Sequence, residues 1–180
     1  NFSEKILRDI GEKPVSGLAY CIGSIDLKPL KLTNKSDFLN AFNLNLVSAA
    51  EVIKTFGDNL KQNKGSVVLF STVAVKQGFP NHVIVSSAKG AIEGLTIALA
   101  AEFAPNIRVN CIAPSLTNSK MSSNLLKNEK IAEGIAKMHP LKRLGEGADS
   151  SSLARFLLSN ESSWITGQVF GVDGGRSSVA

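Results

Sequence analysis

The sequence predicts an α/β protein, a doubly wound parallel sheet in a single domain that covers residues 1–180. Two observations support this. Short apolar runs alternate along the chain with longer segments whose apolar residues recur every three or four positions, which is typical of strands that alternate with amphipathic helices. Glycine or proline separates several of these segments. Strands joined through helices pair in parallel with right-handed crossovers.

The elements can be placed in chain order. Residues 1–10 fit the end of a helix that Gly11 and Pro14 stop. Residues 15–22 are almost continuously apolar, as in a buried parallel strand. A long helix and then a second strand follow, and Pro105 ends a second long helix. The further expected elements share these patterns: helices at 37–61, 86–104 and 149–158, strands at 66–71, 107–113 and 168–172, and a mobile helical segment at 119–137.

The first strand indicates that part of the domain lies upstream. Residues 15–22 are apolar on both faces, so at a sheet edge they would expose unpaired backbone and hydrophobic surface. The remaining sequence offers no strand to cover them, and no glycine-rich phosphate loop with G-x-x-x-G-x-G spacing. We therefore expect the chain to lack an N-terminal βαβαβ portion. A small four-stranded domain is the alternative.

Composition narrows the possible partners. The net charge of +5 comes from scattered lysines with few interleaved aromatic residues, which disfavours nucleic acid. No uninterrupted apolar run approaches the ~20 residues of a membrane span, and no signal peptide is apparent. Cys21 and Cys111 lie at strand ends and fit reduced core residues rather than a disulfide or metal site. A reducing, cytoplasmic location without membrane contact is expected.

Residues 67–121 run strand, loop, helix, strand and loop, with Lys89 near the start of the helix. Together with the ending HPLKRLGEGADSSSLARFLLSNESSWITGQVFGVDGG, this layout resembles the short-chain dehydrogenase/reductase family over nearly the whole chain. The resemblance implies a Rossmann-like fold, NAD or NADP as cofactor, a small-molecule substrate and a homodimer or homotetramer. The residues expected to be structural or at interfaces are Asp149 (as a helix N-cap), Trp164, Thr166, Gly167, Asp173, Gly174 and Gly175.

Three side chains match catalytic positions of the family. Lys89 would bind the nicotinamide ribose and lower the pKa of the acid. Asn45, in LNLNLVSAA, matches a proton-relay asparagine, although a structural hydrogen bond is an equal alternative. Thr72 lies thirteen residues before Val85, at the position of the catalytic serine, with Ser71 as a substitute. A hydroxyl that only caps a turn is the alternative for Thr72.

The catalytic tyrosine of the family is missing. Four residues before Lys89, where the Y-x-x-x-K motif places it, stands Val85. His82 lies seven residues before Lys89, the spacing of the tyrosine in enoyl-acyl-carrier reductases, and imidazole titrates near neutral pH. His82 is therefore a candidate proton donor, with Ser86 or a bound water as the others. A loop histidine without a catalytic role is the alternative.

The resemblance also implies a cofactor surface. Gly23 matches the glycine at the end of the family's Asn-Asn-Ala-Gly strand, where backbone approaches the cofactor ribose. Pro114, Ser115, Thr117 and Ser119 match the turn that holds the nicotinamide carboxamide and contacts the pyrophosphate, with Ser115 in place of glycine.

The expected function is hydride transfer between NAD(P) and a carbonyl/alcohol pair or an enoyl bond, with Lys89, Thr72, Asn45 and His82 as catalytic residues. A catalytically impaired nucleotide-binding regulatory or structural protein is the rival, because the tyrosine is lost. A fragment that binds nothing alone is a third possibility.

Overall fold

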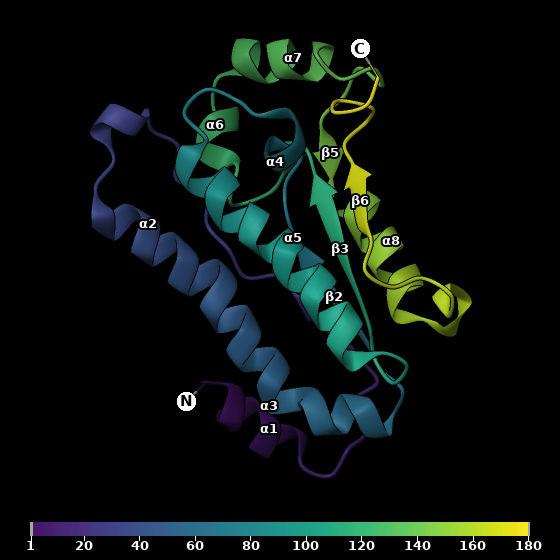
Figure 1. The fold of residues 1–180 in the computed structure, drawn as a ribbon. Coiled ribbons are helices and arrows are strands. Elements are labelled where there is room, and N and C mark those ends of the chain that lie inside the picture. Colours follow the sequence, from purple (N-terminus) through teal and green to yellow (C-terminus); the bar gives the residue numbers. More distant parts are fainter. Residues whose placement is uncertain (1, 180) are drawn as a thin grey trace.

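A computed structural model describes residues 2–179, and a parallel four-stranded sheet lies at its centre (Figure 1). The strands stand in the order β1 (Gly17–Tyr20), β2 (Ser66–Phe70), β3 (Arg108–Pro114) and β6 (Val169–Val172). Leu18 pairs with Val67, and Val67 with Val109. The predicted α/β class and parallel pairing are confirmed. β1 is one edge of the described sheet, where its residues alternate between exposed and buried.

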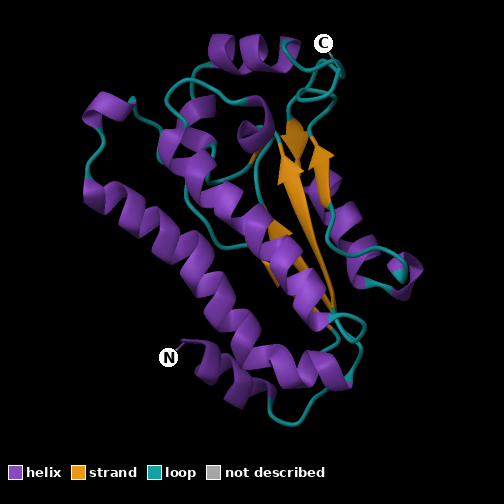
Figure 2. Ribbon diagram, viewed as in Figure 1, coloured by secondary structure: helices purple, strands orange, loops and turns teal. Residues whose placement is uncertain are grey.

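Helices cover both faces of the sheet (Figures 1 and 2). On one face lie α2 (Lys35–Phe42), a π-helical segment (Asn43–Val47), α3 (Ser48–Gln62) and α5 (Val83–Phe103), and on the other lies α8 (Gly147–Leu158). Side chains alternate along β2, so Val67 and Leu69 pack with α3 and α5 whereas Val68 packs with α8. This alternation explains why β2, buried on both sides, reads as a continuous apolar run.

Smaller elements gather mainly beyond the carboxyl ends of the strands. A second, two-stranded parallel sheet, which the sequence did not predict, joins β4 (Thr117–Asn118) to β5 (Gly145–Glu146). The predicted helix at 119–137 is instead two helices, α6 (Ser123–Leu126) and α7 (Glu129–Lys137). The remaining elements are α1 (Phe2–Ile10), α4 (Ala74–Gln77) and 3₁₀ turns at Leu30–Leu32 and Asn160–Ser162.

Three local predictions need correction. α5 begins at Val83, three residues earlier than expected, so that His82 is its N-cap. Asp149 is not the N-cap of α8; that residue is Glu146, and Asp149 accepts a hydrogen bond from its backbone N–H. Cys21 lies beyond the end of β1 and is exposed, whereas Cys111 is buried as predicted.

α5 also corrects the expectation that no segment could span a membrane. By length and composition alone, Val83–Phe103 is long and apolar enough to do so. The sequence pattern hid this because Lys89 and Glu93 interrupt the apolar run. In the structure α5 is a core helix, with Ile84, Ile92 and Ala100 buried, and its apolar composition is explained by packing.

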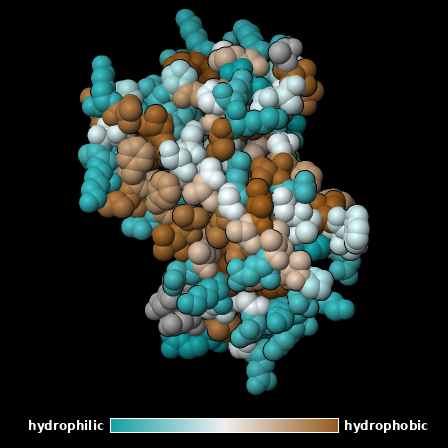
Figure 3. Space-filling model, viewed as in Figure 1, coloured by the Kyte–Doolittle hydropathy of each residue, from teal (hydrophilic) through white to brown (hydrophobic). Residues whose placement is uncertain are grey.

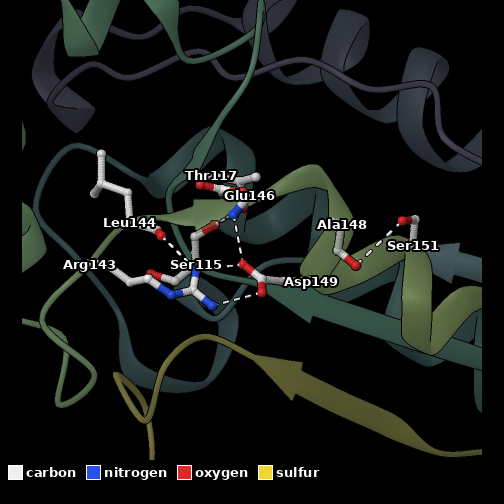
Figure 4. A network of polar contacts seen from close by, with 8 residues as sticks. All are labelled: Ser115, Thr117, Arg143, Leu144, Glu146, Ala148, Asp149 and Ser151. Carbon is white, nitrogen blue, oxygen red and sulfur yellow. Dashed lines mark hydrogen bonds and ion pairs between the residues drawn. The ribbon is translucent and has the colours of Figure 1, made fainter.

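A polar network anchors the start of α8 (Figure 4). Arg143 forms a bidentate ion pair with Asp149 at 2.7 and 2.8 Å. Hydrogen bonds from Arg143, and then from the backbone N–H of Glu146, hold the pKa of Asp149 far below its usual range. The network ties the loop before β5 to the helix that follows β5.

We expect Asp149→Asn to lower the melting temperature at pH 7. Because the folded-state pKa of Asp149 lies below the unfolded value near 4, the carboxylate stabilises the fold above that pH. The stabilisation disappears as the pH falls through the folded-state pKa. Thermal melts between pH 7 and pH 3 should therefore show the difference from wild type shrinking below about pH 4. Asp58→Asn, at an exposed site on α3, is the matched control.

Candidate functional site

The carboxyl ends of three adjacent strands bring together residues that lie far apart in the sequence. Gly23 follows β1, Thr72 follows β2, and Pro114 ends β3. The backbone N–H of Val73 donates to the carbonyl of Pro114 at 3.1 Å, so the Thr72 and Pro114–Ser115 loops are held side by side. Ligands bind at this edge in open parallel sheets.

Lys89 and Asn45 meet over Gly23. A Cβ atom placed on Gly23 would lie 2.9 Å from Asn45 Oδ1 and 3.0 Å from Lys89 Nζ. The two side chains come from different helices, the π-helical segment and α5, and border the same small volume. Any other residue would place a Cβ in the space that the two polar groups share, so that Asn45 Oδ1 or Lys89 Nζ would have to move.

The ammonium group of Lys89 is poorly solvated. Nζ donates to the carbonyl of Phe70 at 2.9 Å. Burial lowers the pKa of Lys89, although the nearby thiols of Cys111 and Cys21 oppose that shift. Burial likewise raises the pKa of Cys21, against the effect of the Lys89 charge. Lys89 is half-buried, and a desolvated ammonium destabilises a fold; charged groups with shifted pKa values are enriched at functional sites.

Asn45 has an unsatisfied acceptor. Its Nδ2 donates to the carbonyl of Ala41 at 2.8 Å, and the residue is 1% exposed. No hydrogen bond from the described residues reaches Oδ1, which faces the volume over Gly23. Asn45 lies within the π-helical segment, a feature that often marks functional sites. Asn45 Oδ1 can accept and the Lys89 ammonium can donate, so together they suit a group that does both, such as a hydroxyl group or a water.

We expect Gly23→Ala to lower kcat/KM by about tenfold or more, because the added methyl group would displace Asn45 Oδ1 or Lys89 Nζ. The fold should survive, since Gly23 lies outside the strands and the lysine end is flexible. Steady-state kinetics, with circular dichroism to confirm folding, test this. Gly57→Ala, where a Cβ meets nothing within 4 Å, is the control.

The structure distinguishes Thr72 from Ser71. Ser71 is buried, and its hydroxyl donates to Glu93 Oε1 at 2.5 Å. Thr72 is half-buried, and its Oγ1 accepts a 3.3 Å hydrogen bond from the backbone N–H of Ala74. That bond uses a lone pair and leaves the Thr72 hydroxyl hydrogen available. Of the two candidates, Thr72 is the one that can donate to a substrate oxygen.

Neither Ser86 nor His82 makes a side-chain hydrogen bond to Lys89 in the described part of the chain. Val85 is buried on the face of α5 that carries Lys89 one turn later. The hydroxyl of Ser86 donates to the carbonyl of Ala74 at 3.1 Å. The Nδ1 atom of His82 lies 2.7 Å from the carbonyl of Pro80, and its ring packs edge-on against Phe79. The partners of the His82 ring that the structure shows are therefore Pro80 and Phe79, and its role as proton donor stays a prediction.

The hydroxyl groups after β3 bond mainly to the loop itself. Thr117 donates to the carbonyl of Ser115 at 3.0 Å, and Ser119 pairs with the hydroxyl of Ser122 at 3.2 Å. Pairing of β4 with β5 holds this loop. Within the described residues, no cluster of histidine, cysteine and acidic side chains could hold a metal ion.

The sequence did not single out two residues at this edge. His139 is 2% exposed, and its Nε2 lies 2.8 Å from Ser115 Oγ. Glu93 is the second, and its Oε1 accepts a hydrogen bond from the Ser71 hydroxyl. Glu93 could have been suspected because it lies one helical turn after Lys89, whereas the position of His139 depends on the turn at residues 173–176, which the sequence pattern does not give.

Comparisons with known proteins agree with this architecture. Residues 4–177 match the family model described as Enoyl-(Acyl carrier protein) reductase. A chloroplastic tropinone reductase homolog of Arabidopsis thaliana is 37% identical over 158 residues, which cover 87% of this chain and 49% of that protein. The chain spans about half the length of several curated relatives it matches.

Solved structures share the fold. A putative gluconate dehydrogenase from Agrobacterium tumefaciens superposes with a TM-score of 0.90 at 27% identity, covering 98% of this chain and 70% of that one. ElxO, solved with NADP bound, gives a TM-score of 0.86 at 27% identity and covers 97% and 71% of the two chains. With its parallel sheet and a family match over residues 4–177, the chain belongs to the short-chain dehydrogenase/reductase family.

Proposed function

We propose that this chain is the catalytic part of an NAD(P)-dependent oxidoreductase that interconverts a carbonyl compound and an alcohol. The observation that carries the proposal is the meeting of Asn45 Oδ1 and Lys89 Nζ over Gly23. A buried amide oxygen without a partner among the described residues and a half-buried ammonium favour a ligand that both accepts and donates hydrogen bonds. The NADP found in ElxO supports the cofactor class, NAD or NADP.

Each side chain has a distinct part in the proposal. Lys89 and Gly23 would hold the ribose of the nicotinamide, and residues 114–119 its carboxamide and phosphates. The bound cofactor supplies the hydride, which goes to the carbonyl carbon. The Thr72 hydroxyl donates a hydrogen bond to the carbonyl oxygen, so that it stabilises the negative charge developing there.

We infer that the proton comes from a water molecule held by Lys89 and Asn45. This water would lie beside the ribose, where it would donate to Asn45 Oδ1, which has no other partner among the described residues, and accept from Lys89 Nζ. The positive charge of Lys89 makes that water more acidic than bulk water. The water would pass its proton to the substrate oxygen. The Lys89 ammonium would then return a proton to the water, and solvent would reprotonate Lys89.

Oxidation of NADH or NADPH against a panel of carbonyl substrates tests the proposal. Purified full-length protein should show turnover that depends on Lys89 and falls by about 10- to 100-fold in Asn45→Ala, since general acid catalysis depends on the water. Ser87→Ala, at an exposed position on α5, is the matched control. Turnover that survives Lys89→Ala unchanged would overturn the mechanism.

The His82→Ala variant tests whether His82, rather than the bound water, donates the proton. Because the Nδ1 atom of His82 faces the carbonyl of Pro80, we expect kcat to change by less than about threefold. A loss of more than tenfold in His82→Ala, with unchanged turnover in the Ser87→Ala control, would assign the acid to His82 instead.

Burial of Val85 at the tyrosine position also favours a second function, a cofactor-binding protein without catalysis. Calorimetry distinguishes the two. Dinucleotide binding without turnover on any substrate of the panel would favour the regulatory or structural role.

We also propose that α2, the π-helical segment and α5 form a dimer interface. Figure 3 shows apolar residues on the face above these helices, and Leu39, Val47 and Ile97 are about half exposed on them. Ile97→Glu should shift the protein toward monomer in light scattering, since a buried unpaired carboxylate is costly. Ile131→Glu, at a similarly exposed site on α7, should not. If Ile97→Glu and Ile131→Glu have the same oligomeric state in light scattering, the proposed interface is wrong.

The cysteines bear on location. Within the described residues both Cys21 and Cys111 are free thiols, which supports our proposal of a reducing, cytoplasmic compartment. Localisation of a tagged full-length protein tests it.

A further inference from the structure

A tyrosine at the end of β1 bonds to the π-helical segment. The Tyr20 hydroxyl donates to the carbonyl of Leu44 at 2.8 Å, across 24 residues of sequence. The direction of this bond is fixed, because a carbonyl oxygen can only accept. Burial raises the pKa of Tyr20, against the effect of a hydrogen bond with Ser48, so the phenol keeps its proton at neutral pH. Leu44 directly precedes Asn45, and the phenol therefore holds the backbone next to that amide.

The carbonyls of this wide helix turn accept from three side chains. Asn45 Nδ2 donates to the carbonyl of Ala41, and Ser48 Oγ donates at the same 2.8 Å to the carbonyl of Asn43. These two donors belong to the helix itself, whereas Tyr20 reaches the turn from the sheet. A π turn replaces the regular i→i−4 pairing, so its carbonyls are open to such donors. Together the three bonds stabilise the wide turn.

The ring of Tyr20 can make this contact from one place only. Tyr20 is 4% exposed and lies in the same core cluster as Ala49 and Ile53 of α3, so the ring cannot turn away without unpacking that cluster. Three residues later the chain reaches Gly23, where an added Cβ would lie 2.9 Å from Asn45 Oδ1. The phenol thus joins the strand that leads to Gly23 with the turn that carries Asn45.

The tyrosine is a departure from the strand pattern that Gly23 matches. Counted back from Gly23, the first asparagine of Asn-Asn-Ala-Gly falls at Tyr20. An asparagine side chain is shorter than a phenol, so the bond to Leu44 belongs to this chain and not to that pattern.

We infer that Tyr20 is a positioning residue, which holds the π-helical segment at Leu44 so that Asn45 Oδ1 stays beside Lys89. The inference rests on the proposed function, in which Asn45 and Lys89 hold the water that supplies the proton. Oδ1 itself accepts no hydrogen bond from the described residues, so its position depends on the backbone that carries it. Tyr20 acts through that backbone and not on the water.

Tyr20→Phe tests the contact, because it keeps the ring and removes only the hydroxyl. In hydrogen–deuterium exchange on the full-length protein, the peptide that covers residues 41–48 should exchange about three- to tenfold faster, as expected for the loss of one hydrogen bond. Exchange in α8 should stay as in wild type. Thr55→Ala is the matched control, since it removes a hydroxyl that donates to the carbonyl of Glu51 at 2.8 Å on α3. Unchanged exchange at residues 41–48 in Tyr20→Phe would overturn the inference.

A double-mutant cycle separates positioning from general support of the fold. In wild type, Tyr20→Phe should lower kcat about three- to tenfold and change KM by less than about twofold. In Asn45→Ala, the same substitution should change kcat by less than about 1.5-fold, because the amide that it positions is gone. Equal losses in the two backgrounds would show that Tyr20 only supports the fold.

Ser48→Ala is the second variant for this cycle. It loosens the same turn at Asn43 and leaves Tyr20 and the core in place, so it serves even if circular dichroism shows that Tyr20→Phe does not fold. Its loss of kcat should likewise disappear in Asn45→Ala. A loss that persists there would contradict the inference, because the turn would then affect turnover by another route.

Activity of the wild type separates this inference from the proposed function. Where wild type reduces a substrate of the panel, a contrary result in the exchange or in the cycle overturns only the role of Tyr20. If wild type reduces none of them, the proposed function is wrong, and the positioning role falls with it even where exchange shows the contact.

Discussion

Replacing Val85 by tyrosine is expected to raise kcat/KM for carbonyl reduction by about 100-fold, because a positioned general acid contributes factors of 10²–10⁴. Val85 precedes Lys89 by one helical turn on the same face of α5, so a phenol there would lie along the direction of the Lys89 ammonium. The positive charge would lower the pKa of the phenol and favour proton donation. Steady-state kinetics with the best carbonyl substrate measure the gain.

Val85→Phe is the control for this experiment. It adds nearly the same volume at a residue that is 6% exposed, but it has no hydroxyl. If kcat/KM rises in Val85→Tyr and does not rise in Val85→Phe, the gain comes from proton donation by the phenol. Equal rates in the two variants would mean that proton supply does not limit turnover, and that the water of Lys89 and Asn45 already suffices.

Lys89→Met should abolish detectable turnover and at the same time stabilise the protein. Loss of the charge removes the ribose contact and the electrostatic support of the acid, for which a 10²–10³-fold loss is typical of a single such group. Stability should rise because a half-buried, desolvated ammonium is exchanged for an apolar side chain of similar length. Kinetics and thermal melts on the same preparation test both effects.

The pH dependence of that stabilisation has a defined sign. The pKa of Lys89 is lower in the folded than in the unfolded chain, so between the two values the unfolded chain binds more protons. Wild type therefore gains stability as the pH rises through this window, and the advantage of Lys89→Met shrinks between pH 7 and pH 10. An advantage that grows with pH would show that Lys89 is stabilised as a cation, against the proposed desolvation.

The sequence was sufficient for features that depend on periodicity and order. Alternating apolar runs predicted the parallel sheet, and the carboxyl ends of its strands place Gly23, Thr72 and Pro114 at one edge. Helical spacing placed Asn45 on the inner side of its helix, where it is buried. The resemblance to the family then indicated that Lys89 and Asn45 belong to one site. No local sequence pattern could show this, because the two residues lie on different helices.

The remaining features depend on tertiary contacts. Ser71 and Thr72 are adjacent hydroxyl residues, and only the approach of Glu93 shows which one is occupied. Cys21 was expected in the core because it lies near the end of the strand predicted at 15–22, yet β1 already ends at Tyr20 and Cys21 is exposed. His139 is buried by a turn some 35 residues further along the chain, at Asp173–Arg176.

The π-helical segment at Asn43–Val47 sets which side chain of its helix lies beside Lys89. A π turn holds one more residue than an α turn, so the wide turn absorbs the extra residue and the helix on either side keeps its facing. Deleting one residue of the segment to restore a regular helix would therefore leave Ile53, Phe56 and Leu60 of α3 packed against the sheet. Such a deletion would move the amide proposed for the relay while the hydrophobic core stays in register.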